Sequence, residues 1–329
     1  MTISERPGIY AGYVVNSAPR FGGGGITVGV AAETNGGSAG SVSGYLDAVQ
    51  KFGLCAMTSL IRILYSNGAT EIIAEPVNDD DYERGFKALL NAGADIILCD
   101  CNTAEVLESM KEALAEKDYR FGIAEFDGSA EECASLAQEL NFERMLLCGN
   151  VTEIRGGIAA ALAGAMAYEN DPMMYFNGRR LYACGELESS YTQQETEELI
   201  SAGVTPVEND GSGIVTVRGV TTKTSTDGVS DISLREANTV MVANEVIKTV
   251  SEALRLKFAR SRNDSLTRGA IRSQVIVELE KLQKAGIIES YGSVSAVADS
   301  SDAPVCRVSF EFTAAHGLNT ILLTAYLEV

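Results

Sequence analysis

Both ends of the chain are predicted to be β-strands, and this feature most constrains the fold. The segment RPGIYAGYVV, residues 6–15, is rich in β-formers, and its apolar residues point to both sides of the pleat. Such a strand needs neighbouring strands and cover on both faces, although chain ends are usually frayed unless they are tied down. The apolar residues of the two terminal strands are Ile9, Tyr10, Tyr13, Val14 and Val15, and Ile321, Leu323, Ala325, Leu327 and Val329.

The length, the lack of long apolar runs and the cysteines indicate a globular protein that folds in a reducing compartment. A chain of 329 residues can bury a sizeable core and predicts about two domains. No apolar run approaches the roughly 20 residues of a membrane helix, and the start MTISERPGIY lacks the layout of a signal peptide. The seven scattered cysteines are typical of reduced thiols. We therefore expect a protein that folds or assembles in a cytoplasm.

The charge is strongly acidic, with one local exception. The net charge of −19 argues against nucleic-acid binding, because phosphate contacts need Lys and Arg. Residues 248–284, however, contain nine basic and four acidic residues, a net charge of +5. This reversal indicates either an acidic partner surface or a solvated helix face.

Strands and helices alternate between residues 45 and 205. The runs TEIIAEPV, ADIILCD, RFGIAEF and RMLLCGN have the length and composition of buried strands. Amphipathic stretches lie between them, and Ser129 with Glu132 and Thr192 with Glu195 have capping-box spacing. This pattern predicts an α/β domain with a parallel, helix-covered sheet.

The pattern changes after residue 205, where an α+β region is predicted. Ser233 and Glu236 are expected to open a long helix, and a second helix should end near Gly286. GIIESYGSVSAV and VCRVSFEF then predict a β-hairpin, which is marginal alone and needs further strands. The long helix is expected to bury one stripe: Val240, Ala243, Ile247, Val250 and Leu254.

The motifs that carry chemistry do not converge on a reaction. The single histidine, His316, lies in a predicted turn, and FGGGG at 21–25 lacks the Lys-Ser/Thr of a phosphate loop. CDC at 99–101, NDDD at 78–81 and RGG at 155–157 are candidate ligand, cation and anion sites, but strand ends, helix dipoles and close packing explain them equally. A cytosolic α/β enzyme or nucleotide- or small-ligand-binding protein, with its ligand near Cys99–Asn102 or the Gly-rich turn, remains the alternative hypothesis.

Several segments in order resemble the contractile tail sheath family. RPGIYAGYVV is similar to the opening "PG-V/I-Y" arm of that family, and LYSNGATEIIAEPV to its "NGG…-V/I" strand. The stretch from LESSYTQQETEELISAGV to VRGVTT, the helix SDISLREANTVMVANEVIKTV and LEKLQKAGIIESYGSV match later sheath segments. The resemblance runs through most of the chain.

The resemblance implies four regions and a use for the terminal strands. These are an N-terminal linking arm (1–18), an α/β sheath domain (19–208), an inner domain of long helices and hairpin (209–314) and a C-terminal linking arm (315–329). In sheath proteins the arms add as strands to hairpins of neighbouring subunits, a permanent form of β-augmentation. The implied acceptor hairpin spans about 287–313 and includes Ile288, Val294, Val308, Phe310 and Phe312.

The resemblance also implies a structural role and no catalytic, cofactor or metal site. Sheath subunits form hexameric rings that stack around an inner tube, between baseplate and terminator proteins, and contract to drive the tube through a target envelope. Such particles assemble in a bacterial host cytoplasm and become part of a virion tail or a released bacteriocin-like particle, without nucleic-acid binding or membrane insertion by the sheath. By hypothesis, five basic residues face the tube: Lys248, Arg255, Lys257, Arg260 and Arg262.

Overall fold

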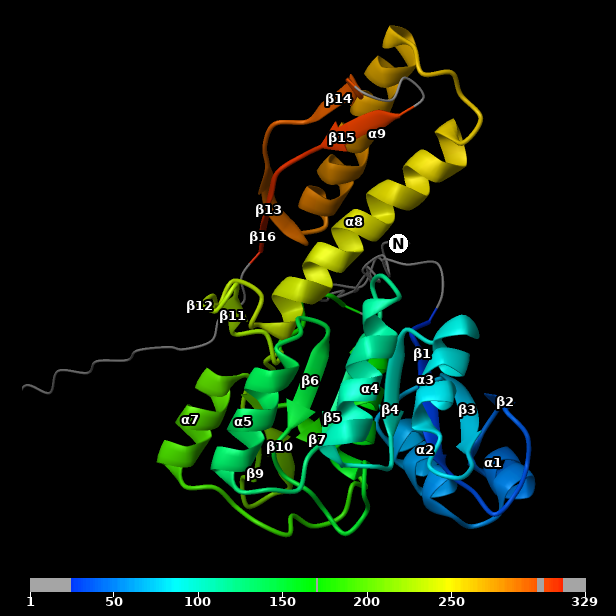
Figure 1. Cartoon of the computed structure of the whole chain (residues 1–329), viewed down its shortest axis with the longest axis vertical. Helices are drawn as coiled ribbons and strands as arrows, with labels where there is room; N and C mark the ends of the chain where they lie inside the picture. The colour runs from blue at the N-terminus through cyan, green and yellow to red at the C-terminus, as the bar shows by residue number, and fades with distance from the viewer. Residues whose placement is uncertain (1–24, 170, 301–304, 316–329) are drawn as a thin grey trace, which may run out of the picture.

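The buried apolar runs form one seven-stranded sheet in the computed structural model, which describes residues 25–169, 171–300 and 305–315 (Figure 1). The strand order is β2-β3-β1-β4-β5-β6-β8, and all neighbours are parallel except the edge strand β2, which is antiparallel to β3. The α/β prediction is confirmed. The strands are β1 (Thr27–Glu33), β2 (Gly40–Val42), β3 (Glu71–Val77), β4 (Ile96–Cys99), β5 (Phe121–Glu125), β6 (Met145–Cys148) and β8 (Val204–Thr205).

Helices cover both faces of this sheet, which is why its strands are apolar throughout. In β4, Ile96 and Leu98 face one core cluster, whereas Ile97 and Cys99 face the other. The first face is covered by α1 (Tyr45–Phe52), α2 (Ala56–Ser66) and α6 (Gly157–Glu169). The second is covered by α3 (Tyr82–Asn91), α4 (Ala104–Ala115), α5 (Ala130–Leu140) and α7 (Gln193–Ala202).

Two of the predicted helix starts are confirmed in detail. The Ser129 side chain accepts from the Glu132 backbone, and the Glu132 side chain accepts from the Ser129 backbone. Thr192 and Glu195 repeat this capping box at α7. Asp81 caps α3 by accepting from the Arg84 backbone at 3.2 Å. Local sequence therefore fixes where these helices begin.

Helix α6 is buried along most of its length because it lies between the sheet and α2. Its residues from Gly157 to Met166 are all buried. At Gly164 the two helices approach so closely that an added Cβ would lie 2.8 Å from the Leu64 carbonyl oxygen and 2.8 Å from the Asn67 Cβ. A glycine is therefore required where α2 and α6 cross.

We expect Gly164→Ala to destabilise the protein by about 1–3 kcal/mol, because the new methyl group meets backbone that cannot move aside. Gly269→Ala is the matched control, since a Cβ at this position of α9 meets nothing within 4 Å. The control should stabilise by up to about 1 kcal/mol through helix propensity. Urea unfolding measures both changes, and equal effects of the two substitutions would contradict the close crossing.

A small sheet and a short hairpin lead from the body to the C-terminal region. Thr222 and Asn141 bind backbone groups across this connection, which keeps residues 217–236 on the body. The domain boundary expected at 208/209 stays a prediction. The strands here are β7 (Arg180–Leu181), β9 (Val207–Asn209), β10 (Ile214–Thr216), β11 (Ser225–Thr226) and β12 (Val229–Ser230).

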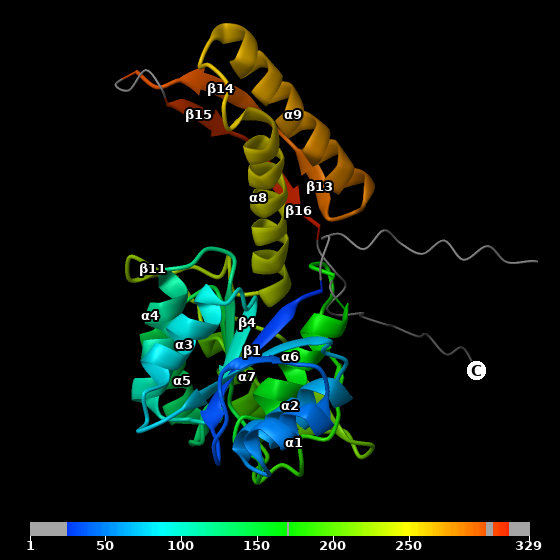
Figure 2. The same ribbon diagram turned by 90° about the vertical axis from the view of Figure 1, so that its right-hand side faces the viewer.

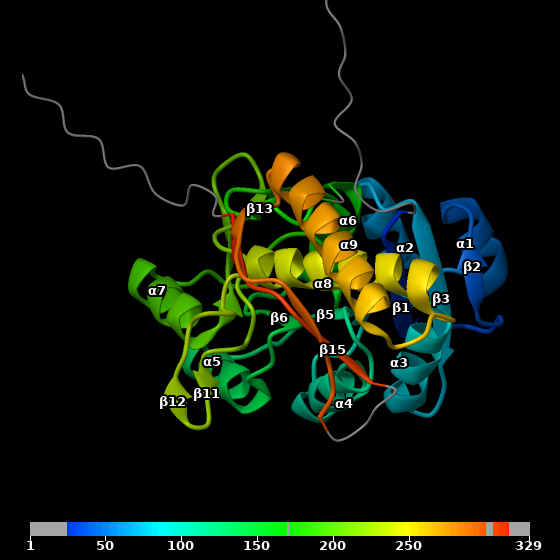
Figure 3. The same ribbon diagram turned by 90° about the horizontal axis from the view of Figure 1, so that it is seen from above.

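The C-terminal unit, residues 237–300 and 305–315 as described, has its own core and stands on the body (Figures 1 and 2). Seen from above, α8 runs across the body (Figure 3). Helix α9 packs against α8, and antiparallel strands lie along α9, as the predicted hairpin requires. Its elements are α8 (Ala237–Phe258), α9 (Ser265–Lys284), β13 (Ile288–Tyr291), β14 (Ser295–Ala298), β15 (Cys306–Ser309) and β16 (Phe312–Ala314).

The expected start and buried stripe of α8 were partly wrong. Glu236 is the N-cap residue, and its side chain pairs with Arg218 instead of closing a capping box with Ser233. Val242, Val246 and Val250 face the C-terminal core, whereas Ile247 is 40% exposed. The first turns of α8 pack on the body and the later turns pack on α9. The helix therefore buries one face near its start and a different face farther along.

The predicted end of α9 is confirmed. Gly286 has a φ of 79° and follows the C-cap Ala285. The backbone N–H groups of Gly286 and Ile287 donate to the carbonyls of Gln283 and Leu282, which is the Schellman pattern. Ile287 and Leu282 also meet in the C-terminal core, so this turn directs the chain into β13.

Candidate functional site

The carboxyl end of the sheet, where parallel α/β folds bind ligands, is filled by the chain itself at β5. The Glu125 side chain is 2% exposed and accepts from the backbone N–H groups of Gly156 and Ala159 at 3.0 Å, and from that of Ile158. The three donors lie at the start of α6, and Gly156 belongs to the RGG segment at 155–157 that was a candidate anion site. A carboxylate of this protein occupies that position.

Burial dominates the acid–base behaviour of this group. It raises the pKa of Glu125 to about 7, although the three backbone N–H groups act in the opposite direction. The described side chains around it include two buried thiols, Cys148 and Cys184, whose own pKa values are raised by burial. The cluster therefore has the features of a structural cap of α6.

The end of β4 is closed in the same way. Asp100 accepts from the Glu33 backbone at 3.0 Å and from the Tyr82 hydroxyl at 2.8 Å. Cys99 is buried, and a Cβ at Gly156 would lie 2.4 Å from its carbonyl oxygen. Burial raises the pKa of the Cys99 thiol well above its usual range, which disfavours a thiolate nucleophile or ligand. The first part of the proposed ligand position, at Cys99 and Asp100, is thus packed with protein atoms, whereas Cys101 and Asn102 are half-buried.

The remaining chemical motifs have local structural roles or lie elsewhere. Asp81 of the NDDD segment caps α3. In the described residues, no group of three His, Cys, Asp or Glu side chains is arranged to hold a metal ion. No described helix combines the length and hydropathy of a membrane span. His316 and residues 21–24 of the Gly-rich turn lie outside the described residues.

The C-terminal hairpin presents one apolar face to the helices and leaves backbone edges unpaired. Residues of the predicted acceptor set all belong to the C-terminal core or pack against it. In the described chain, β13 pairs only with β16, and β14 only with β15. Each strand therefore has one edge that can accept another strand. The predicted acceptor residues are Ile288 and Val294, both buried, and Val308, Phe310 and Phe312, all half-buried.

The two predicted arm strands cannot be placed. Residues 9–15 and 321–329 lie outside the described residues, so no pairing of either arm is visible. The described chain ends at Ala315, whose backbone N–H donates to the Ile287 carbonyl at 3.3 Å, directly beside the hairpin. The described chain therefore ends beside the sheet that was predicted to accept arms.

Four of the five predicted tube-facing residues gather at one place. Arg255 and Lys257 lie in the last turn of α8, and Arg260 and Arg262 in the connection to α9, at the end of the C-terminal unit farthest from the body (Figure 1). All four are exposed, and Lys257 donates to the Gln274 side chain at 2.6 Å.

Lys248 lies apart from these four, lower on α8 and beside the body. The sequence reasoning also missed two neighbours of the basic group. Leu256 is 82% exposed and Leu266 is 83% exposed, so apolar and basic side chains share this tip.

Comparison with family models finds a match for the C-terminal part of the chain. Residues 229–328 match the family model described as the phage tail sheath C-terminal domain. No curated protein matches the sequence.

Solved structures match the whole described architecture. The contracted helical sheath of the anti-feeding prophage has 14% identity and a TM-score of 0.70, with 99% of this chain and 100% of that chain covered. A chain of the baseplate of the same prophage has 15% identity and a TM-score of 0.70 over 99% and 100%. The sheath tail protein of Desulfitobacterium hafniense has 11% identity and a TM-score of 0.69 over 93% and 100%. At these identities the likeness establishes a common fold.

Proposed function

We propose that this chain is a structural subunit of a contractile tail sheath. Residues 229–328 match the phage tail sheath C-terminal domain, and the described chain has the fold of solved sheath proteins, which supports the proposal. The sheath subunits form hexameric rings that stack around an inner tube, between a baseplate and a terminator protein. Contraction of the stack drives the tube through a target cell envelope. The particle assembles in a bacterial cytoplasm and becomes a virion tail or a bacteriocin-like particle.

One observation carries this proposal. The C-terminal unit combines a sheath-domain sequence with a hairpin whose described strands are paired on one side only. In the proposed assembly, residues 8–15 of one neighbour and 319–328 of another pair with these edges, which extends a marginal ribbon into a stable sheet. Residues 1–18 and 315–329 are then the linking arms.

The proposed contraction needs no bound nucleotide, since interfaces not yet formed in the extended state can store the energy. If contraction buried on the order of 500 Å² more apolar area per subunit, each subunit would release free energy on the order of 10 kcal/mol. Summed over many rings, this drives the tube forward. The extended state is then trapped kinetically until the baseplate releases it.

The alternative, a ligand-binding enzyme of the α/β class, has less support because Glu125 and Asp100 fill the usual ligand position. Negative-stain microscopy of the purified protein separates the two hypotheses. Long hollow cylinders with striated rings support the sheath subunit. Uniform small particles whose melting temperature rises with a nucleotide or metabolite contradict it.

The basic tip gives a second test. We expect the double variant Arg260→Glu and Arg262→Glu to reduce tube-templated sheath by about tenfold, because reversed charges repel a surface that the wild-type residues attract through short-range, screened electrostatics. Co-assembly with the tube protein and counting of tube-filled particles measures the effect.

The matched control is Arg62→Glu with Lys284→Glu. Both residues are exposed, neither has an ion pair with a described residue, and the change in net charge is the same. The control should assemble as the wild type does. Equal yields of tube-filled particles from the two double variants would contradict a tube-facing role of the tip.

A further inference from the structure

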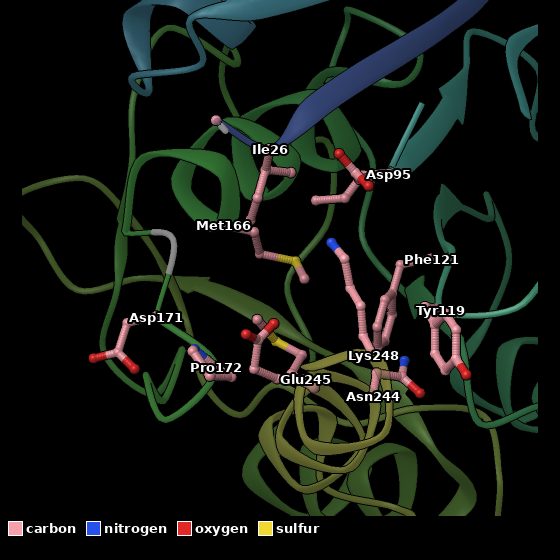
Figure 4. Close-up of a pocket in the computed structure, with 13 residues that line it drawn as sticks. Ile26, Asp95, Tyr119, Phe121, Met166, Asp171, Pro172, Asn244, Glu245 and Lys248 are labelled. Atoms are coloured by element: carbon pink, nitrogen blue, oxygen red, sulfur yellow. The ribbon is translucent and has the colours of Figure 1, made fainter. Parts of the chain in front are cut away.

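A cavity of about 130 Å³ lies where α8 crosses the amino end of the sheet (Figure 4). Its walls come from the starts of β1, β4 and β5, from the end of α6 and from α8. It is therefore on the opposite edge of the sheet from Glu125 and Asp100, and the sheath hypothesis does not assign it a role.

The cavity has an apolar interior and an acidic rim. Ile26, Phe121 and Met166 supply apolar wall, and Figure 4 shows Lys248 extending from α8 toward the opposite wall. Two rim carboxylates, Asp171 and Glu245, have no cationic partner among the described residues. A group that fits here combines an apolar body with one adjacent positive charge.

Other rim groups refine this description. Asp95 is already satisfied, since it pairs with Arg120 and accepts from the Thr27 backbone at 3.0 Å. The Asn244 Nδ2 atom is buried without a described hydrogen-bond partner. Buried polar atoms of this kind are rare in completed cores. A peptide segment offers both the apolar atoms that suit this lining and hydrogen-bond acceptors that the Asn244 amide can reach.

The described chain begins at the cavity, because Gly25 is one of its lining residues. Arg20 and Phe21 precede it in the sequence, joined to it by Gly22, Gly23 and Gly24. Four residues span at most about 14 Å, and glycines allow the chain to turn back sharply. A cavity of roughly 150 Å³ accommodates benzene, so one of about 130 Å³ is close to the size of a phenyl ring.

We propose that Phe21 of the same chain fills this cavity and that Arg20 pairs with the Glu245 and Asp171 carboxylates. The contact holds the residues that follow the N-terminal arm at the interface between the body and α8. This deepens the proposed function, on which it rests only for the use of the arm, because it sets the point from which residues 1–18 leave the subunit.

The variant Phe21→Trp tests the proposal directly, since the chain has no tryptophan. We expect blue-shifted indole emission and several-fold lower acrylamide quenching than for an exposed indole, in dilute unassembled protein as well as in particles. Emission of a water-exposed indole in the dilute protein overturns the proposal. Protection that appears only in particles also overturns it, because the cavity is then filled by a neighbouring copy.

A charge change in the Phe21→Trp background tests the acidic rim. Glu245→Lys should red-shift the emission and increase quenching several-fold, whereas Glu252→Lys, an exposed change on the same helix, should leave both unchanged. Equal responses of the two variants overturn the pairing with Arg20. The measurement needs no polymer, so a failure of the sheath hypothesis leaves its outcome readable.

Discussion

Deletion of residues 1–15 is expected to convert long striated cylinders into discrete particles. The deletion removes the predicted N-terminal strand and leaves the whole described structure, which begins at residue 25, intact. Each subunit then keeps its hairpin and its C-terminal arm but has no N-terminal strand to donate to a neighbour. Negative-stain microscopy and sedimentation velocity measure the loss, and circular dichroism checks that the subunit remains folded.

The expected effect is large because strand addition acts at every subunit contact. A strand of about eight residues contributes several main-chain hydrogen bonds, each worth roughly 0.5–1.5 kcal/mol, and apolar burial in addition. In a lattice with one such link per subunit, its removal weakens every ring and every stack at once. An unpaired edge in the deleted protein also remains an aggregation hazard.

A shorter deletion provides the control. Residues 1–5, MTISE, precede the predicted strand, so their removal shortens the chain without changing the strand. This variant should form cylinders like those of the full chain. Normal cylinders from the 1–15 deletion would show that the N-terminal strand is not the link, and amorphous precipitate from the 1–5 deletion would show that truncation itself is harmful.

The fold could be predicted for segments whose surroundings are the same along their whole length. The strands of the sheet are buried on both faces, so runs such as RMLLCGN identify them without any knowledge of their neighbours. Capping residues such as Ser129 form their hydrogen bonds within one helical turn, so they too can be recognised from the sequence. Helix α8 was harder to predict because its first turns pack on the body and its later turns on α9, and a single apolar stripe cannot describe two partners.

The candidate sites could likewise be predicted where they depend on a local sequence pattern, and not where they combine distant residues. The alternation of Val308, Phe310 and Phe312 with exposed neighbours is a local pattern, and the structure reproduces it. The cavity at the foot of α8 combines residues from position 25 to position 248, so no local pattern reveals it. The role of Glu125 was hidden for the same reason, because a glutamate that ends a strand gives no sign of the helix start 31 residues later.

Replacement of Glu125 is expected to cause a large loss of stability for a single substitution. Glu125→Ala leaves the buried N–H groups of Gly156, Ile158 and Ala159 without an acceptor, and an unsatisfied buried donor costs about 1–3 kcal/mol. We therefore expect a loss of about 3–6 kcal/mol in urea unfolding. Glu132→Ala removes a carboxylate that caps a helix at the surface, so this control should lose much less.

The pH dependence of the unfolding free energy distinguishes the charge of the Glu125 side chain from its size and shape. Because burial raises the pKa of Glu125 from 4.5 to about 7, the folded state binds this proton more tightly than the unfolded state does. The resulting stability, about 3 kcal/mol, is fully present below pH 4.5 and is lost as the pH rises through 7. Glu125→Gln cannot titrate, so the stability of the wild type relative to this variant should fall across that window. Parallel curves for the two proteins would mean that Glu125 has the same pKa in the folded and unfolded states, with its three N–H donors offsetting burial.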